Sequence, residues 1–355
     1  MGKLDQQQLD FILESAILAP SADNQHRIRF QLTEDTIRVR YSEAELPPEG
    51  GYKRVLALLS LGAVSENFTV AASRFGMQSE TVLFPDLTQP DLVMQIRLQP
   101  DQAAVDPDPL WQAIPLRHTN RQLRFRGPAM TGAERGELDA AAGNYPACQL
   151  FWLDESARRR TALRLMRRAE TERFRNRLLH EELFSAIRFD IGWRTACPEG
   201  LPPGALGVEA PLRAFFALLR HWPIMCLANL LGMHHMLGLR SCGLPCGLAP
   251  HLGLLAVRNT HNQSIFDTGR AFQRVWLAAT SQGRVMQPMP ASALYALEGA
   301  RTEGIPAALQ HDLAGGWKAS LDGAIPLMLF RMGKAKPSLI VTGRRRVRDY
   351  LEWEG

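Results

Sequence analysis

Apolar side chains follow two different periods along the N-terminal part of the chain. Leu9, Ile12, Leu13 and Ile17 recur at helical spacing, so they share one face of a helix. Residues 28–32 alternate apolar and polar side chains, which is typical of a half-buried strand. The predicted elements are, in chain order, a helix over 4–18, strands over 28–32 and 36–41, a helix over 55–75, and strands over 78–84 and 91–98.

Turn-forming residues separate these elements. Pro20-Ser21 ends the first helix, and Gly76 follows the long helix as its C-cap. Glu34-Asp35 is predicted as the hairpin turn between the first two strands. Residues 43–50 are predicted to form a loop, and the polar, Pro- and Asp-rich residues 99–109 a linker between two units.

The remainder of the chain carries a longer and more varied series of elements. Residues 131–134 form a capping box, whose threonine and glutamate side chains bind backbone N–H groups at the start of a helix that ends near Gly143. The other predicted elements are a short helix over 110–116, a strand over 149–153, a long arginine-rich helix over 155–184, an irregular segment over 192–207, apolar helices within 211–239, a strand over 252–257, a helix over 268–283, a loop over 284–291, and closing strand or helix elements over 319–333 and 339–341.

The most apolar stretch covers residues 214–239. Arg220, His221 and Pro223 interrupt it, so it falls short of the ~20 uninterrupted apolar residues that a transmembrane helix requires. We therefore predict one or two buried helices here and no stable membrane insertion. A hydrophobic lid or a membrane-touching hairpin is the alternative.

Composition indicates a folded chain with a substantial core. Of the 355 residues, 46% are hydrophobic and 22% are charged, which is an ordinary globular balance. The length suits two domains or one large fused unit. The net charge of +5 favours anionic ligands without singling out nucleic acid. The N-terminal sequence has neither a signal-peptide core nor a twin-arginine motif, so a cytoplasmic protein is expected.

The five cysteines are odd in number and widely spread, which argues against a secreted disulfide framework. Cys242 and Cys246 lie near His234, His235 and His251 in the sequence. A metal site is one interpretation, and buried thiols in a Gly/Pro-rich turn are the other. The three-residue spacing between the cysteines differs from the usual zinc spacing and favours buried thiols without a metal.

Arginines crowd the predicted helix over 155–184. They would suit RNA in principle, but glutamates interleave with them and no aromatic platform accompanies them. A solvated helix face is the favoured interpretation, and we expect no nucleic-acid partner.

A faint internal repeat relates residues 61–76 to residues 268–283. Both segments have glycine in second place (Gly62 and Gly269), then an Ala-Ala pair, and glycine again in last place. Two buried helices can match in this way by chance, but the shared glycine spacing favours an internal duplication.

Familiar catalytic signatures are missing from the sequence. It contains no Walker A loop, no G-x-S-x-G elbow, no H-E-x-x-H motif and no convincing G-x-G-x-x-G. An enzyme with this sequence would therefore take its chemistry from a cofactor.

Three polar stretches are candidates for binding a cofactor. They are the Pro-led turn over 19–24, the arginines with a hydroxyl and an amide over 117–121, and the basic run over 344–348. Guanidinium groups offer fixed paired donors to phosphate oxygens. Each stretch alone is equally compatible with an ordinary turn, an exposed basic loop or a solvated tail.

Together these stretches resemble the nitroreductase superfamily, and within it the fused, single-chain Acg-like branch, over nearly the whole chain. Ala19, Pro20, Ser21 and Asn24 match an A-P-S-x-x-N turn that lies along the flavin ring in that family. Residues 117–121 resemble its Arg-Arg-Ser/Thr-x-Arg motif, which binds the phosphate and ribityl chain of flavin mononucleotide (FMN), with His118 replacing the second arginine.

The resemblance implies one FMN per chain, held between two halves, with NAD(P)H as a transient hydride donor. It implies no catalytic residue, because the cofactor supplies the chemistry. The cofactor-binding residues that it implies are Pro20, Ser21, Asn24, Arg117, His118, Thr119, Asn120, Arg121, Gln287, Pro288, Met289, Arg345 and Arg346, with Arg344 as an alternative member of the last pair.

The resemblance also implies an α+β fold. Two tandem nitroreductase-like halves, each an antiparallel-rich sheet with surrounding helices, would form a single-chain pseudo-dimer that is a monomer or a homodimer. The halves are expected over 1–105 and 106–355, with the apolar helical insertion at about 192–251 as a lid over the flavin.

The implied activity is the reduction of a small-molecule electron acceptor, nitroaromatic or quinone-like, by NAD(P)H through ping-pong hydride transfer. The alternative is a non-enzymatic protein that stores or sequesters FMN under its lid. The apolar insertion favours this alternative. So does the sequence Asn24-Gln25-His26-Arg27-Ile28, which departs from the N-x-Q-P-W of the family.

Overall fold

The computed structural model describes residues 4–33, 36–42, 46–101 and 106–352. The helices are α1 (Gln6–Ile17), α2 (Tyr52–Ser73), α3 (Gly132–Gly143), α4 (Ser156–Arg175), α5 (Arg177–Ser185), α6 (Arg213–Leu218), α7 (Trp222–Leu230), α8 (Met233–Gly238), α9 (Leu244–Gly247), α10 (Asn262–Ser281), α11 (Ala291–Leu294) and α12 (Ala307–Ser320). The strands are β1 (Ile28–Leu32), β2 (Thr36–Tyr41), β3 (Met77–Leu83), β4 (Leu92–Pro100), β5 (Cys148–Trp152), β6 (His251–Val257), β7 (Val285–Pro288) and β8 (Ile325–Gly333).

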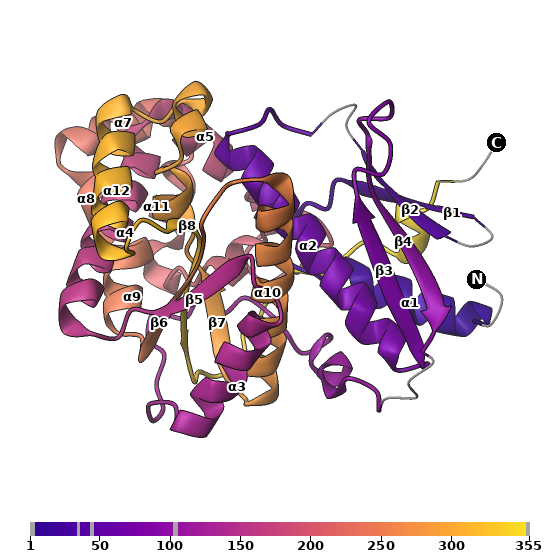
Figure 1. Ribbon diagram of the computed structural model, residues 1–355. Helices are drawn as coiled ribbons and strands as arrows, with labels where there is room; N and C mark the ends of the chain where they lie inside the picture. Colours follow the sequence, from indigo (N-terminus) through magenta and orange to yellow (C-terminus); the bar gives the residue numbers. More distant parts are fainter. Residues whose placement is uncertain (1–3, 34–35, 43–45, 102–105, 353–355) are drawn as a thin grey trace.

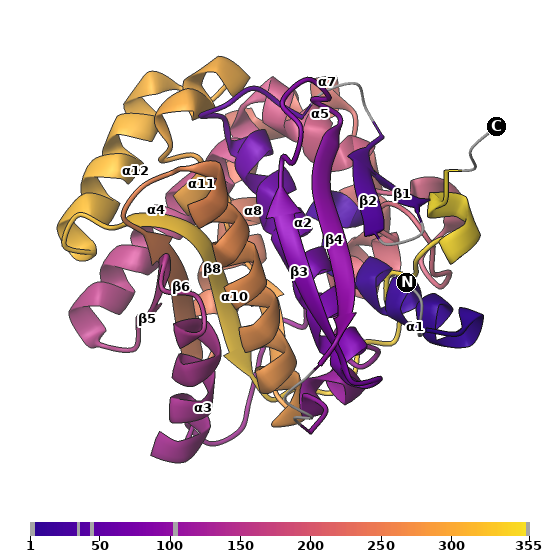
Figure 2. The same ribbon diagram turned by 45° about the vertical axis from the view of Figure 1, so that its right-hand side comes forward.

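Two four-stranded antiparallel sheets share one strand order. The first sheet runs β1-β2-β4-β3 and the second runs β5-β6-β8-β7. The two sheets lie on either side of a central pair of helices, α2 and α10 (Figures 1 and 2). The fold is therefore layered as sheet, helix, helix, sheet, and its largest core lies around the central helix pair.

Helix α2 is the most deeply enclosed helix of the first half. Of the helices described, it is the one long and apolar enough to cross a membrane, and 83% of its apolar window is buried inside the fold. Two buried polar side chains of α2 bond to α10. The Asn67 amide oxygen accepts from the Gln273 amide at 2.7 Å, and the fully buried Glu66 pairs with Arg270 and Arg274. These contacts join the two halves through their interiors.

The C-terminal segment returns to the first half. Leu351 forms a parallel bridge with Phe30 of β1, and the backbone N–H of Glu352 donates to the Phe30 carbonyl at 2.9 Å. The buried ring of Tyr350 packs against the Phe30 ring, 6.5 Å between centroids. The two sheets are thus interlocked by a segment that leaves one half and ends on the other.

Several sequence predictions are confirmed. Strands β1 and β2 have the predicted bounds, and Thr131 and Glu134 form the predicted capping box of α3. Gly76 follows α2 with a positive φ of 64°, a left-handed conformation that favours glycine. The predicted turn at Glu34-Asp35 lies outside the described residues, as do residues 43–45 of the predicted loop and 102–105 of the predicted linker.

Other predictions are wrong. The single helix over 155–184 is two helices, because Asn176 adopts an extended conformation between α4 and α5 and caps α5 through its side chain. The predicted loop over 284–291 contains β7, which pairs with β8. No strand forms over 339–341, and α11 and α12 fall where no separate helix was predicted.

The prediction of buried helices within 211–239 is also wrong. The segment forms three short helices, α6, α7 and α8, and many of their apolar side chains are exposed. Leu219 and Met225 are buried with Phe184 of α5 in a small cluster separate from the main core. Short helices of this kind have too few buried positions to cover both faces, so part of their apolar surface stays in water.

Candidate functional site

A cavity lies between the two halves of the chain, in two compartments that share lining residues. The larger has a volume of about 230 Å³ and lies between α2, α5, α10 and α11. The smaller has a volume of about 90 Å³ and lies between the turn after α1, residues 117–121 and Arg344. The shared lining residues are Pro20, Ser21, Asp23, Thr119 and Arg121.

The turn after α1 forms the boundary between the compartments. Asp23 and Asn24 follow each other with positive φ angles of 51° and 57°, a conformation that costs energy in residues other than glycine. The buried Ser21 hydroxyl has no hydrogen-bond partner. A strained turn that presents an unpaired hydroxyl to a cavity indicates a binding surface.

Arg117 contributes a buried guanidinium to the smaller compartment, and this group forms no ion pair with a described carboxylate. Its side chain is buried, donates to the Leu18 carbonyl at 2.8 Å, and lies 4.4 Å from the centre of the Trp276 ring. Its Nε has no partner. Burial, followed by the nearby charge of Arg344, lowers the pKa of Arg117 to about 9.

Arg121 and Arg344 add two further positive charges. Burial lowers the pKa of each to about 10. Within the part of the chain that the structure describes, no carboxylate forms an ion pair with Arg117, Arg121 or Arg344. Three desolvated cations that share a compartment without a salt-bridge partner repel each other, so the compartment favours an anion.

Asp23 is an acidic residue that lines the same compartment as these three arginines. Burial raises the pKa of its carboxyl, and Glu182 acts in the same direction, against Arg173, Arg121 and Arg27. Asp23 lines both compartments, and its carboxyl acts on the charge of Arg121.

The C-terminal basic run divides between the cavity and the protein surface. Arg344 lines the smaller compartment and donates to the carbonyls of Ile17 and Ala19 at 2.7 and 2.8 Å. Arg345 pairs instead with Glu199, and the backbone N–H of Arg346 donates to the Asp349 carboxylate at 3.1 Å. Of the three consecutive arginines, Arg344 is the one that lines the cavity, and it was the alternative choice from the sequence.

Asn24 holds other segments instead of facing the cavity freely. Its amide donates to the carbonyl of Gly200 at 3.2 Å and to that of Gly343 at 3.4 Å, and its oxygen accepts from Arg344. Asn24 therefore ties residues 198–200 and 343–344 to the turn after α1.

The other residues of the 117–121 motif have different surroundings. Thr119 forms a parallel bridge with Met286 of β7 and lines both compartments. The Asn120 amide donates to the Lys336 carbonyl at 2.9 Å and is buried by that contact. His118 lines the smaller compartment but keeps part of its surface in water, and partial desolvation of its ring, followed by the charges of Arg117 and Arg344, lowers its pKa.

The segment 287–289 contributes one residue to the cavity lining. Pro288 lines the larger compartment. The Gln287 oxygen accepts from the fully buried Arg331 at 2.8 Å, and Met289 is buried in the main core. The residues that line the cavity are Pro20, Ser21, Asn24, Arg117, His118, Thr119, Arg121 and Pro288. Gln287, Met289, Asn120, Arg345 and Arg346 do not line it and make other contacts.

Sequence reasoning missed most of the apolar and acidic wall. Leu56 and Leu59 of α2 and Trp276 of α10 line the larger compartment, as expected of buried helix faces. Arg173, Glu182 and Tyr295 also line it, and no motif marks them. Helices α4 and α5 and the residue after α11 meet at the cavity only through tertiary packing, which local sequence patterns do not reveal.

Residues 197–207 cover one side of the site. Leu201 lines the smaller compartment, and the Gly343 N–H donates to the Cys197 carbonyl at 2.8 Å. On the other side, the Tyr52 hydroxyl donates to Glu182 at 2.8 Å and joins α2 to α5. The segment that follows α5 therefore forms part of the cavity wall.

The cysteine and histidine residues of the earlier metal hypothesis do not converge. Cys242 and Cys246 are buried with their sulfurs 4.0 Å apart, and His251 bonds to Asp154 at 2.9 Å. Among the described residues, no group of three or more His, Cys, Asp or Glu side chains has the arrangement of a metal site.

Comparisons with known proteins find partial structural similarity. No protein-family model matches the sequence, and no curated protein matches it either. A nitroreductase with bound FMN from Desulfitobacterium hafniense DCB-2 is 14% identical, and the match covers 70% of this chain and 99% of that chain with a TM-score of 0.37. The FMN-dependent nitroreductase NfnB from Mycobacterium smegmatis, in complex with NADPH, is 18% identical, and the match covers 69% of this chain and 97% of that chain with a TM-score of 0.36. A BluB-like flavoprotein from Clostridium difficile 630 is 12% identical, and the match covers 70% of this chain and 100% of that chain with a TM-score of 0.38.

Proposed function

We propose that this chain is an FMN-binding oxidoreductase of the nitroreductase type, with both halves of the fold in one chain. The observation that carries the proposal is the group of Arg117, Arg121 and Arg344, three guanidinium groups around one compartment that form no ion pair with a described carboxylate. A phosphate monoester would neutralise this charge and supply the missing acceptors.

The residues present fit FMN in other respects. Arg117 Nε and Ser21 Oγ are buried polar atoms without partners, and both belong to residues that line the smaller compartment. The larger compartment adjoins it and has apolar walls such as Leu56, Trp276 and Pro288, which suit a flat aromatic ring. A ligand with an anionic end and an apolar ring would place its anionic end in the smaller, cationic compartment and its ring in the larger, apolar one.

The chemistry that FMN supplies when bound is hydride transfer, from NAD(P)H to a nitroaromatic or quinone-like acceptor. The protein residues have supporting tasks. Arg117, Arg121 and Arg344 hold the anionic end, and the apolar wall excludes water. Thr119 and Ser21 face the junction of the compartments, where they can donate hydrogen bonds. No protein acid or base is assigned to the reaction.

The fused pseudo-dimer is part of the same proposal. The identical strand order of the two sheets supports an origin by internal duplication, and so does the packing of α2 on α10, which carry the repeat segments. The first half supplies the turn after α1, and the second supplies residues 117–121 and Arg344. We therefore propose one cofactor site per chain, formed between a half over 1–105 and a half over 106–355.

A storage function is the second candidate. The observation that favours it is the cover over the site, where Leu201 lines the smaller compartment and Glu182 of α5 is bonded to Tyr52. A lid formed by α5 and residues 197–207 would retain FMN and exclude acceptors. We place either function in the cytoplasm, in a monomer or a homodimer.

The first test is the absorption spectrum of the purified protein, with the cofactor released by heat and identified by its mass. Yellow protein with about one FMN per chain is the expected result. Colourless protein that also fails to bind added FMN would overturn the proposal. Steady-state oxidation of NAD(P)H with an added nitroarene then separates the two candidates, because a storage protein would bind FMN without turnover.

A further inference from the structure

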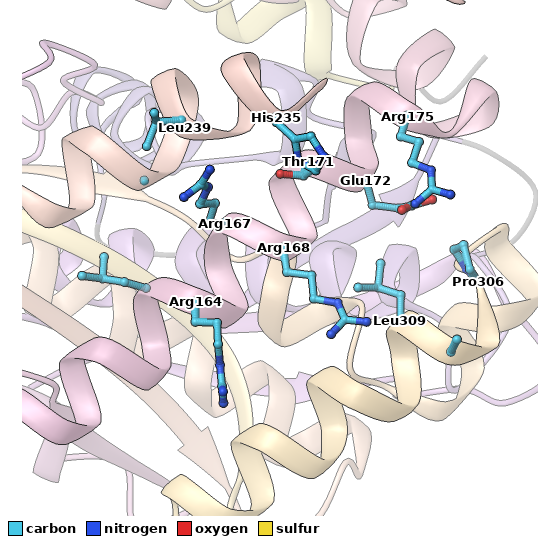
Figure 3. A pocket seen from close by; sticks show the side chains of 13 residues that line it. Arg164, Arg167, Arg168, Thr171, Glu172, Arg175, His235, Leu239, Pro306 and Leu309 are labelled. Carbon is cyan, nitrogen blue, oxygen red and sulfur yellow. The ribbon is translucent and has the colours of Figure 1, made fainter. Parts of the chain in front are cut away.

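A second, open groove lies on the outer face of α4, away from the cavity between the halves. Its volume is about 810 Å³, and it runs between α4, the start of α12 and the end of α8 (Figure 3). We call it the arginine groove, because Arg164, Arg167, Arg168 and Arg175 line it. These positions recur at intervals of three, four and seven residues, which places them on one face of the helix.

The arginine groove has little negative charge of its own. Arg168 pairs with Asp312, but within the described chain no carboxylate pairs with Arg164, Arg167 or Arg175. Glu172 is the acidic side chain that lines the groove, and burial raises its pKa against the influence of Arg175 and Arg168. Like charges on one helix face destabilise the helix slightly, so this face is built to meet an anion.

A protruding apolar turn borders the groove. We call it the leucine turn and define it by Leu227, Leu230, Leu231 and Met236, whose exposures are 67%, 81%, 89% and 62%. Side chains this exposed project from the surface and do not line a hollow. They would insert into an apolar phase more readily than they would receive a partner helix.

The leucine turn is fixed beside the arginine groove. The Asn229 amide donates to the carbonyl of Phe174 at 2.9 Å, and Phe174 directly precedes Arg175 of the groove. His235 lines the groove next to the exposed Met236. Figure 1 shows α7 and α8 on the side of the molecule opposite the first sheet and the two chain ends. The leucine turn is therefore held next to the Arg175 end of the arginine groove.

We propose that the arginine groove and the leucine turn form a docking surface for an anionic lipid bilayer. The leucines enter the interfacial region, and the arginines bind the phosphates of the headgroups. Apolar insertion and electrostatic attraction to anionic lipid act together in peripheral membrane binding. The surface would hold the protein at a membrane face by peripheral contact.

The test is co-sedimentation of the full-length protein with unilamellar vesicles. Vesicles of phosphatidylcholine containing one-third phosphatidylglycerol should bind the protein, vesicles of phosphatidylcholine alone should bind it weakly, and added salt should release it. Leu230→Ser/Leu231→Ser and Arg164→Gln/Arg167→Gln should each reduce binding by about tenfold or more.

Matched controls keep the test specific. Leu87→Ser removes an equally exposed leucine (89%) from the β3–β4 connection, and Arg97→Gln/Arg348→Gln removes the same charge from distant exposed sites. Both should leave vesicle binding unchanged, and circular dichroism should show all variants folded. Binding that is equal on both lipid compositions, or equal in all variants, would overturn the proposal. So would a concentration-dependent dimer that Leu230→Ser/Leu231→Ser dissociates, since a second copy would then cover this surface.

Discussion

Gly62 of α2 and Gly269 of α10 lie against each other's helix backbone where the two halves meet. A Cβ atom on Gly62 would lie 2.1 Å from the Phe266 carbonyl oxygen, and one on Gly269 would lie 2.3 Å from the Leu59 carbonyl oxygen. Both glycines occupy the second place of the faint sequence repeat. The close crossing accounts for glycine at this place in both segments, because any side chain would hold the helices apart.

Substitution at this crossing should therefore weaken the whole fold. Gly62→Ala and Gly269→Ala should each lower the free energy of unfolding by about 1–3 kcal/mol, because the added methyl group meets backbone that cannot move aside. Gly136→Ala on the exposed face of α3 has open space and should raise it by about 0.5–1 kcal/mol. Urea unfolding measures all three. Equal stability of Gly62→Ala and Gly136→Ala would mean that the helices separate easily.

The sequence predicted correctly those elements whose stabilising residues lie within a few positions of each other. The alternating residues of β1 and β2 and the capping box at Thr131 were recognisable because their pattern is complete within a few residues. Strand β7 was missed because its four residues end in Pro288 and gain their pairing from β8, far along the chain. The break at Asn176 was missed because the apolar spacing continues across it.

The candidate site was predictable where short motifs exist. Residues of the turn after α1 and most residues of 117–121 line one cavity, and their binding of a cofactor stays a prediction. The choice of Arg344 over Arg345 and Arg346 was not predictable, because an irregular segment has no period that fixes which side chain points inward. Arg173 and Glu182 were not predictable either, because each lies in a charge-rich helix whose inward face is set by packing.

Arg121 should separate cofactor binding from fold stability. It forms an ion pair with no described residue, so Arg121→Gln should leave the cofactor-free protein at least as stable as the parent. The same change should weaken FMN binding by about 1.5–3 kcal/mol through loss of a charged hydrogen-bonding partner. Calorimetric titration with FMN measures this effect, and Arg117→Ala/Arg121→Ala should lose more.

Arg345→Gln is the matched control for Arg121→Gln. Arg345 pairs with Glu199 outside the cavity lining, so its loss should change FMN affinity little. An effect of Arg345→Gln equal to that of Arg121→Gln would show that the phosphate is bound by the C-terminal pair instead of the arginines at the cavity.

Asp23 should destabilise the cofactor-free protein at neutral pH. Burial raises the pKa of its carboxyl, so the folded state favours the protonated form. The stabilisation from this proton is present below the unfolded pKa of about 3.9 and is lost as pH rises through the folded pKa. Asp23→Asn should therefore be more stable than the parent at neutral pH, with a difference that shrinks in acid. Asparagine also tolerates the positive φ of 51°.

Unfolding free energies of the parent and Asp23→Asn, measured from neutral pH into acid, test whether the buried Asp23 carboxylate destabilises the fold. A variant that is less stable than the parent at neutral pH would show that Arg121 and Arg173 stabilise the Asp23 carboxylate more than burial penalises it.

His26 should make the turn after α1 sensitive to acid. Its buried ring lies 2.9 Å from the Ala19 carbonyl through Nε2, and burial followed by the charge of Arg344 lowers its pKa to about 3. Because the folded pKa is depressed, the stability from neutral His26 is present above the unfolded pKa of about 6.5 and is lost as pH falls towards the folded value.

The expected slope is that of one proton taken up on unfolding, about 1.4 kcal/mol per pH unit between these two pKa values. His26→Gln can still donate to the Ala19 carbonyl but does not titrate, so its unfolding free energy should fall less steeply with acid. His261→Gln, at the exposed start of α10, is the matched control and should keep the slope of the parent. If His26→Gln and the parent lose stability in parallel, the acid sensitivity belongs to other groups, and the Ala19 carbonyl is held chiefly by Arg344, which also donates to it at 2.8 Å.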